Sequence, residues 1–293
     1  MGGGADAGLG RMSRSYTRGV RPDPAALWDL AVPARPGLPG VSMAGFTARD
    51  PGPVDLAVVP YPAVTLIVDL RDTLTVDDVG DRHRGSVVAG LPASGIRGQG
   101  RGIECLQVRL SPVAAYALLG GAVELDGRVT ALADVLPGAE RLEDRLRSTP
   151  SWRQRFAVVE EALARSLARR VDPEVGLAWR AIGASSGLVR VDRIAAETGW
   201  SRQRLWSRFR SQLGLTPKRA ARLVRFDEAA HRLAAGRSPA DVAAELGYAD
   251  QSHLHREVRD FTGATPARVA AAAWLAVDDV AWRSQPHPAR RRR

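Results

Sequence analysis

The stretches Ile194-Ala-Ala-Glu-Thr-Gly199-Trp200 and Val242-Ala-Ala-Glu-Leu-Gly247-Tyr248 are two copies of one sequence pattern. Further along, Gly214-Leu-Thr-Pro217 is repeated in the same way as Gly263-Ala-Thr-Pro266. In each copy a short alanine-rich helix is expected to end at a glycine, because glycine tolerates the left-handed conformation at a helix exit. The repeat therefore predicts two similar folded units between residues 191 and 266.

A second helix is expected to follow that glycine in each unit. Ser201 and Asp250 can cap it, since their side-chain oxygens accept hydrogen bonds from free backbone N–H groups of the first turn. Two helices joined by a short glycine-containing turn form the helix-turn-helix motif. Between the units, Thr216-Pro217 is expected to begin a helix of ~17 residues and ~25 Å, which can place two recognition helices in successive segments of the major groove.

The second helix of each unit has an apolar side and a polar side. Leu205 and Phe209 are predicted to face the core in the first copy, as are Leu254, Val258 and Phe261 in the second. The opposite side carries groups that can hydrogen-bond base edges in the major groove, and the start of the connecting helix can hold a phosphate. The predicted DNA contacts are Arg202, Gln203, Trp206, Ser207, Arg210 and Lys218, then Gln251, Ser252, His255, Arg256 and Arg259.

Two of these positions have an alternative interpretation. Trp206 could pack against neighbouring helices instead of touching thymine methyl groups, because a large aromatic side chain is costly to leave in water. Arg202 could simply be solvated. The sequence leaves both alternatives open.

Two helix-turn-helix units joined by a long helix, with Arg208-Phe209, Arg225-Phe226 and Gln251-Ser-His253, resemble the AraC/XylS-type DNA-binding domain. The resemblance covers about Gly187 to Val269. It implies a bacterial transcription regulator that reads double-stranded promoter DNA, with RNA polymerase as a partner if it is an activator. It also implies an amino-terminal sensor, commonly cupin-like, that responds to a small-molecule effector.

The charge distribution fits a polyanionic partner. The formal net charge is +10, and the segment from Ser201 to Arg210 carries four arginines and no acid. Such a local surplus is the electrostatic footprint of phosphate contact. The second recognition helix is less basic than the first, because it also carries Asp250, Glu257 and Asp260.

The amino-terminal half has the pattern of a β-rich domain. Short apolar runs separated by glycine, proline and aspartate are typical of a barrel or sandwich. Gly98 to Gly102 is interpreted as a turn because of its glycines. The predicted strands are Val41 to Phe46, Val54 to Val59, Val64 to Asp69, Ser86 to Ala89 and Ile103 to Leu110.

Helices are expected after the strands. Ser111-Pro112 is predicted to cap a helix that reaches Leu119, and a longer helix is predicted from Ser151 to Arg170. This longer helix has an apolar stripe that could form the seam of an antiparallel homodimer. Alternatively, the stripe packs on the strand domain of its own chain. Its members are Trp152, Phe156, Val159, Leu163 and Leu167.

The sequence thus predicts an α+β chain with two domains. A disordered basic tail at 1–21 precedes a β-rich, cupin-like sensor and dimerisation domain with following helices at 22–180. An all-α DNA-binding domain of two helix-turn-helix units joined by a long helix follows at 187–274, and a basic tail closes the chain at 284–293.

An enzyme is not expected. Of five histidines only His83 falls in the sensor, and an i, i+2 pair such as His253 and His255 points in different directions on a helix, so no metal or cofactor is predicted. Cys105, the single cysteine, excludes a disulfide framework and is interpreted as a structural residue of a strand. The alternative is a DNA-binding domain fused to a repair or cupin-type enzyme domain.

No membrane partner is expected, because the chain has neither a long apolar run nor the apolar region of a signal peptide. This pattern predicts a cytoplasmic protein, and the expected DNA partner predicts that it is nucleoid-associated.

Overall fold

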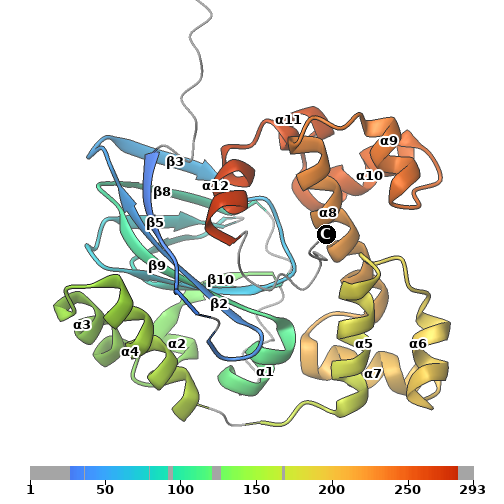
Figure 1. The fold of residues 1–293 in the computed structure, drawn as a ribbon, viewed down its shortest axis with the longest axis horizontal. Coiled ribbons are helices and arrows are strands. Elements are labelled where there is room, and N and C mark those ends of the chain that lie inside the picture. Colours follow the sequence, from blue (N-terminus) through green and yellow to red (C-terminus); the bar gives the residue numbers. More distant parts are fainter. Residues whose placement is uncertain are drawn as a thin grey trace, which may run out of the picture.

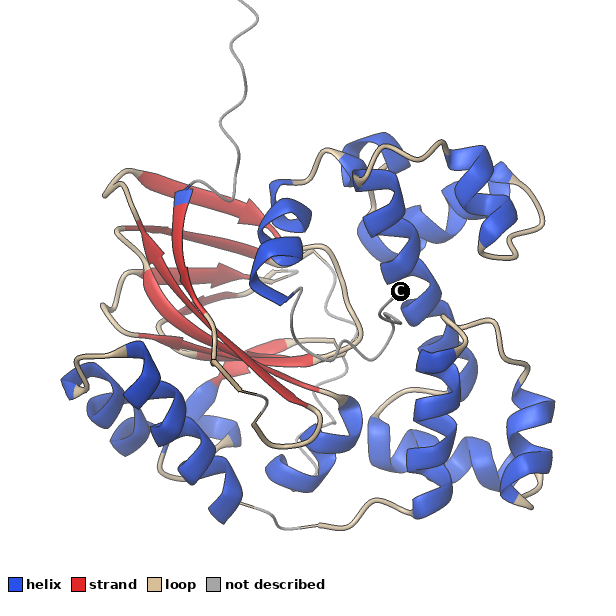
Figure 2. Cartoon of the chain, in the orientation of Figure 1, coloured by secondary structure: helices blue, strands red, loops and turns tan. Residues whose placement is uncertain are grey.

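The computed structural model describes residues 27–35, 37–78, 80–91, 95–120, 127–166 and 169–282. The predicted tails at 1–21 and 284–293, and Leu167 of the apolar stripe, lie outside these residues. Strands gather in one part of the molecule, with several helices beside them, and the other part is entirely helical (Figure 2). The predicted α+β organisation, a β-rich part followed by a helical part, is confirmed.

The β-rich part contains two antiparallel sheets (Figure 1). In the larger sheet the order is β1 (Trp28–Ala31), β2 (Val41–Ala48), β9 (Glu104–Leu110), β4 (Val64–Asp69), β7 (Val87–Ala89) and β10 (Val129–Ala131). In the smaller sheet it is β3 (Pro53–Ala57), β8 (Arg97–Arg101), β5 (Leu74–Asp77) and β6 (Arg82–Arg84). The central strand β9 pairs with both β2 and β4.

All five predicted strands are present, but the prediction of a turn at Gly98 to Gly102 was wrong. This segment forms β8, which pairs with β3 on one side and β5 on the other. At Gly100 the lack of a side chain permits close packing, because a Cβ atom there would lie 2.4 Å from the backbone oxygen of Thr73. Glycine inside a strand can mark a site where another part of the backbone approaches closely.

Four helices follow: α1 (Pro112–Leu119), α2 (Leu132–Val135), α3 (Ala139–Ser148) and α4 (Trp152–Arg165). Ser111 caps α1 as predicted, accepting a hydrogen bond of 3.2 Å from the N–H of Ala114. The apolar stripe of α4 packs inside its own chain, because its residues Phe156, Val159 and Leu163 are buried in the hydrophobic core. Packing on the strand domain is therefore confirmed, and the dimer seam through 151–170 was wrong.

The helical part consists of α5 (Pro173–Ala184), α6 (Val191–Thr198), α7 (Arg202–Leu213), α8 (Pro217–Ala234), α9 (Pro239–Glu245), α10 (Gln251–Thr262) and α11 (Pro266–Ala270). A last helix, α12 (Ala273–Trp282), leaves this group and lies beside β2 and β3 as well as α8 (Figure 1). Its residues Val277, Ala281 and Trp282 are buried in one cluster with Trp28 and Phe46 of the sheet. The two parts of the molecule therefore share a core.

We predict that Gly45→Ala lowers the free energy of unfolding by about 1–3 kcal/mol, because a Cβ atom there would lie 2.4 Å from the Trp152 ring of α4. Urea unfolding followed by circular dichroism measures this change. Gly98→Ala is the matched control, since its Cβ would meet nothing within 4 Å. Equal stability of the two variants would show that α4 does not pack on β2.

Candidate functional site

The two helix-turn-helix units have the local geometry that their sequence repeat predicts. Gly199 and Gly247 adopt φ values of 68° and 65° at the exits of the first helices. Ser201 accepts a hydrogen bond of 3.2 Å from the N–H of Arg204, and Asp250 accepts one of 2.7 Å from the N–H of His253. These caps fix where α7 and α10, the predicted recognition helices, begin.

The apolar sides of both recognition helices are buried. Leu205 and Phe209 of α7 are fully buried, as are Leu254 and Val258 of α10. Phe261 of α10 stacks on a phenylalanine of α8, Phe226, with ring centroids 4.8 Å apart. The connecting helix α8 has 18 residues, close to the predicted length, and begins at the predicted Thr216 cap. Burial of one side leaves the opposite side of each recognition helix in water.

Every side chain predicted to contact DNA is exposed in the structure. They are Arg202, Gln203, Trp206, Ser207, Arg210, Lys218, Gln251, Ser252, His255, Arg256 and Arg259. Trp206 is 46% exposed, so it does not fill the core, and the Arg210 guanidinium lies 5.2 Å from its ring centroid. Contact with DNA itself stays a prediction for all of them.

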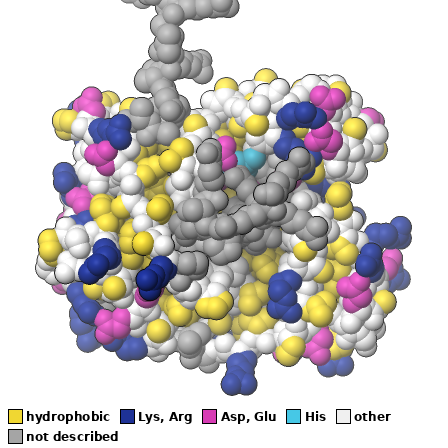
Figure 3. Space-filling view, viewed as in Figure 1, with side chains coloured by type: hydrophobic (Ala, Val, Ile, Leu, Met, Phe, Trp, Pro, Cys, Tyr) yellow, Lys and Arg dark blue, Asp and Glu magenta, His cyan; other side chains and the backbone are white. Residues whose placement is uncertain are grey.

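Some of these exposed residues already have partners in the chain. Arg202 forms an ion pair of 3.1 Å with Asp192 of α6. Within the described residues, Arg256 and Arg259 have no ion-pair partner. Basic and acidic side chains are mixed over the visible face of the helical part (Figure 3). The recognition helices, rather than a uniformly basic surface, therefore define the candidate interface.

The acidic residues of α10 are engaged inside the protein. Glu257 is only 2% exposed and accepts hydrogen bonds from Arg222 and Arg225 of α8 and from the Tyr248 hydroxyl, at 2.8–3.2 Å. Asp260 pairs with Arg222 at 2.9 Å. Burial, together with the Glu257 carboxylate, raises the pKa of Tyr248 well above its usual range. Glu257 thus fastens α10 to α8, a role that its acidic character alone did not reveal.

The first recognition helix is fastened in a different way. Arg208 of α7 forms a bidentate pair with Asp172 at 2.7 and 3.0 Å, directly before α5. Hydrogen bonding to Arg208 lowers the pKa of the Asp172 carboxyl. The side chain of Gln212 accepts from the N–H of Asp172 at 3.0 Å. Arg208 is therefore a structural residue of the first unit, whereas sequence reasoning noticed it only as part of a motif.

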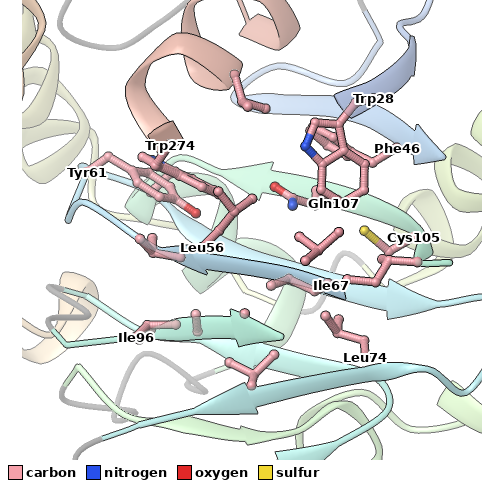
Figure 4. Close-up of a pocket in the computed structure, with 18 of the residues that line it drawn as sticks. Trp28, Phe46, Leu56, Tyr61, Ile67, Leu74, Ile96, Cys105, Gln107 and Trp274 are labelled. Atoms are coloured by element: carbon pink, nitrogen blue, oxygen red, sulfur yellow. The ribbon is translucent and has the colours of Figure 1, made fainter. Parts of the chain in front are cut away.

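A second candidate site is a cavity of about 70 Å³ between the two sheets, drawn in Figure 4. Among the residues that the structure describes, its lining is mainly apolar and contains no charged side chain. Cys105 lies in this lining, and burial raises the pKa of its thiol to about 12. The thiol is therefore protonated, which supports the structural interpretation of this cysteine.

Within the described ranges, no three or more His, Cys, Asp or Glu side chains come together in a way that could hold a metal ion. None of the described helices combines the length and apolar character needed to cross a membrane.

Comparison with known proteins identifies the helical part. A family model described as a helix-turn-helix domain matches residues 194–272. This segment is an AraC-type helix-turn-helix domain. A regulator from Bacillus subtilis, described as the uncharacterized HTH-type transcriptional regulator YbfI, is 35% identical over 66 residues. The match covers 22% of this chain and 24% of that protein, so the chain matches about a quarter of its relative's length.

Solved structures with a partly similar arrangement are known. An apo variant of ToxT from Vibrio cholerae aligns with 82% of this chain and 100% of its own length, at 10% identity and a TM-score of 0.45. The carboxy-terminal domain of AraT from Geobacillus stearothermophilus aligns with 35% of this chain and 87% of its own length, at 20% identity and a TM-score of 0.33.

We predict that Glu257→Ala destabilises the protein by about 3 kcal/mol, because it leaves the partly buried Arg225 and the Tyr248 hydroxyl without their acceptor. Chemical denaturation of the full chain measures the loss. Asp260→Ala is the control, since its carboxylate is 64% exposed and is expected to contribute at most about 0.5 kcal/mol. Equal effects of the two substitutions would contradict the fastening role of Glu257.

Proposed function

We propose that this protein is a sequence-specific DNA-binding transcriptional regulator that responds to a small molecule through its amino-terminal part. One observation carries the proposal: both recognition helices expose their polar sides while their apolar sides are buried at a common connecting helix. With 18 residues, α8 is ~27 Å long. This length approaches the ~34 Å of one turn of DNA, which is the spacing that two successive major-groove contacts require.

The exposed side chains divide into two kinds of contact. Gln203 on α7 and Arg256 on α10 can make bidentate hydrogen bonds to purine edges, and such contacts carry sequence information. Lys218 lies in the first turn of α8, where free backbone N–H groups also favour an anion. It is proposed to hold a backbone phosphate, which sets affinity without selecting sequence.

The proposed partners are promoter DNA, a small-molecule effector and, for activation, RNA polymerase. We propose that the DNA-binding part begins at α5, because Val175, Ala178 and Ile182 of this helix are buried in the core that it shares with α8. A nucleoid-associated, cytoplasmic location follows from the function. An alkyl-accepting repair enzyme is disfavoured, since the one cysteine is buried and protonated.

We predict different signatures for the two kinds of contact. The preferred site is first found by mapping genome-wide occupancy, and fluorescence anisotropy on that duplex and on a scrambled duplex then gives affinities at several salt concentrations. Arg256→Ala is expected to cost about 1–3 kcal/mol on the preferred duplex and little on the scrambled one. Lys218→Ala is expected to weaken both duplexes alike and to reduce the salt slope by about one.

Arg153→Ala serves as the control, because this arginine is exposed on α4, away from the recognition helices. It is expected to bind both duplexes like the unchanged protein. Unchanged affinity and preference after Arg256→Ala would remove α10 from base recognition. Occupancy spread evenly over the genome would refute a site-specific regulator.

A further inference from the structure

The helix α12 lines part of the cavity of the β-rich part, although it follows the second helix-turn-helix unit in the chain. Trp274 and Val277 of α12 belong to the cavity lining together with Trp28 and Phe46 of the sheet (Figure 4). Trp274 stacks on Tyr61, which lies between β3 and β4, with ring centroids 5.8 Å apart. A molecule in this cavity would therefore touch the sheets and α12 at the same time.

A buried ion pair holds α12 on the sheet. Arg109 of β9 lies 2.5 Å from the carboxylate of Asp278, and these side chains are 6% and 2% exposed. The Arg109 guanidinium also lies 3.9 Å from the ring centroid of Tyr61 and 4.2 Å from that of Trp282. Because a buried charge is costly without its partner, docked α12 depends on this pair.

The same carboxylate reaches the helix that joins the two DNA-reading units. Asp278 lies 3.0 Å from Nε2 of His231 on α8, and Nδ1 of His231 lies 2.9 Å from the backbone oxygen of Asp227. Arg109, Asp278 and His231 thus link the sheet, α12 and α8 through direct contacts. A change in the docking of α12 must alter the contacts of α8.

The cavity lining indicates which ligand it can take. Trp28 Nε1 and Gln107 Oε1 are buried and have no hydrogen-bond partner within the described part of the chain, although the Gln107 side chain also interacts with Cys105. One is a donor and the other an acceptor, and a hydroxyl group can satisfy both. Burial raises the pKa of Tyr61 and of Cys105, so the lining is uncharged and disfavours an ion.

We propose that the cavity binds a small, uncharged, mainly hydrocarbon ligand that carries a hydroxyl group, and that this ligand stabilises the docked position of α12. The ligand's contacts with Trp274 and Val277 exist only when α12 is docked. The free energy of ligand binding therefore adds to the stability of the docked state of α12. The inference rests on the proposed function, because it makes the docking of α12 the step through which an effector constrains the DNA-reading helices.

The ligand class is tested by calorimetric titration of the full chain at neutral pH with three probes of similar shape. Para-cresol carries a neutral hydroxyl, toluene carries no polar group and para-toluate is charged. We expect para-cresol to bind most tightly, toluene more weakly and para-toluate not at all. Gln107→Met keeps a side chain of similar length without the acceptor. This substitution is expected to lower the affinity for para-cresol about five- to tenfold and to leave the affinity for toluene within about twofold of the unchanged protein.

The docking of α12 is tested by hydrogen exchange of its backbone amides. Para-cresol is expected to slow exchange in α12 of the unchanged protein. Asp278→Asn is expected to speed amide exchange in α12 without ligand. It is also expected to lower the affinity for para-cresol in proportion to the loss in the fraction of molecules that have α12 docked. Val280→Ala, at an exposed position of the same helix, is expected to change neither quantity.

Three results would overturn the inference: para-toluate binding as tightly as para-cresol, para-cresol leaving α12 exchange unchanged, or Asp278→Asn exchanging like the unchanged protein. If circular dichroism shows that Asp278→Asn does not fold, Trp274→Ala replaces it. Trp274→Ala is expected to lower the affinities for para-cresol and toluene alike. Occupancy mapping tests the proposed function separately. A site-specific protein that ignores para-cresol would refute this inference alone.

Discussion

The connecting helix α8 is the constraint on which the rest of the helical part depends. Eleven of its 18 residues are buried, including Leu223, Phe226 and Ala230. It is covered by helices from both units and by α12. The recognition helices α7 and α10 bury their apolar sides in the core that surrounds α8. Only the polar side of each recognition helix therefore faces water. The orientation of the proposed DNA-contacting side chains follows from this packing.

Buried charges then determine which helices pack against α8. Glu257 engages Arg222 and Arg225 at one place, and Asp278 engages His231 and Arg109 at another. Removing one partner of such a pair leaves a buried charge whose desolvation is no longer offset, so the pairs favour one arrangement over its alternatives. The second pair also includes a residue of the β-rich part. The DNA-reading units and the cavity are therefore joined by contacts between side chains, and not only by the chain that runs between them.

The repeat and the family resemblance predicted the helical part well because their signals are local. Caps such as Ser201, Thr216 and Asp250 act within one helical turn, and the apolar periodicity of α7 and α10 shows directly which side is buried. Strand β8 was missed because glycines usually indicate turns. The roles of Glu257, Asp278 and Arg109 were missed for a different reason. Their partners lie on other elements, and no local pattern shows that a charged side chain will be buried beside a particular opposite charge.

We propose that two recognition helices, held by one connecting helix, read one segment of DNA. Hydroxyl-radical and methylation footprinting on a site found by occupancy mapping tests it most directly. We expect two protected major-groove segments about one helical turn apart, roughly 10 base pairs, on the same face of the duplex. Protection of a single segment, or of two segments on opposite faces, would contradict it.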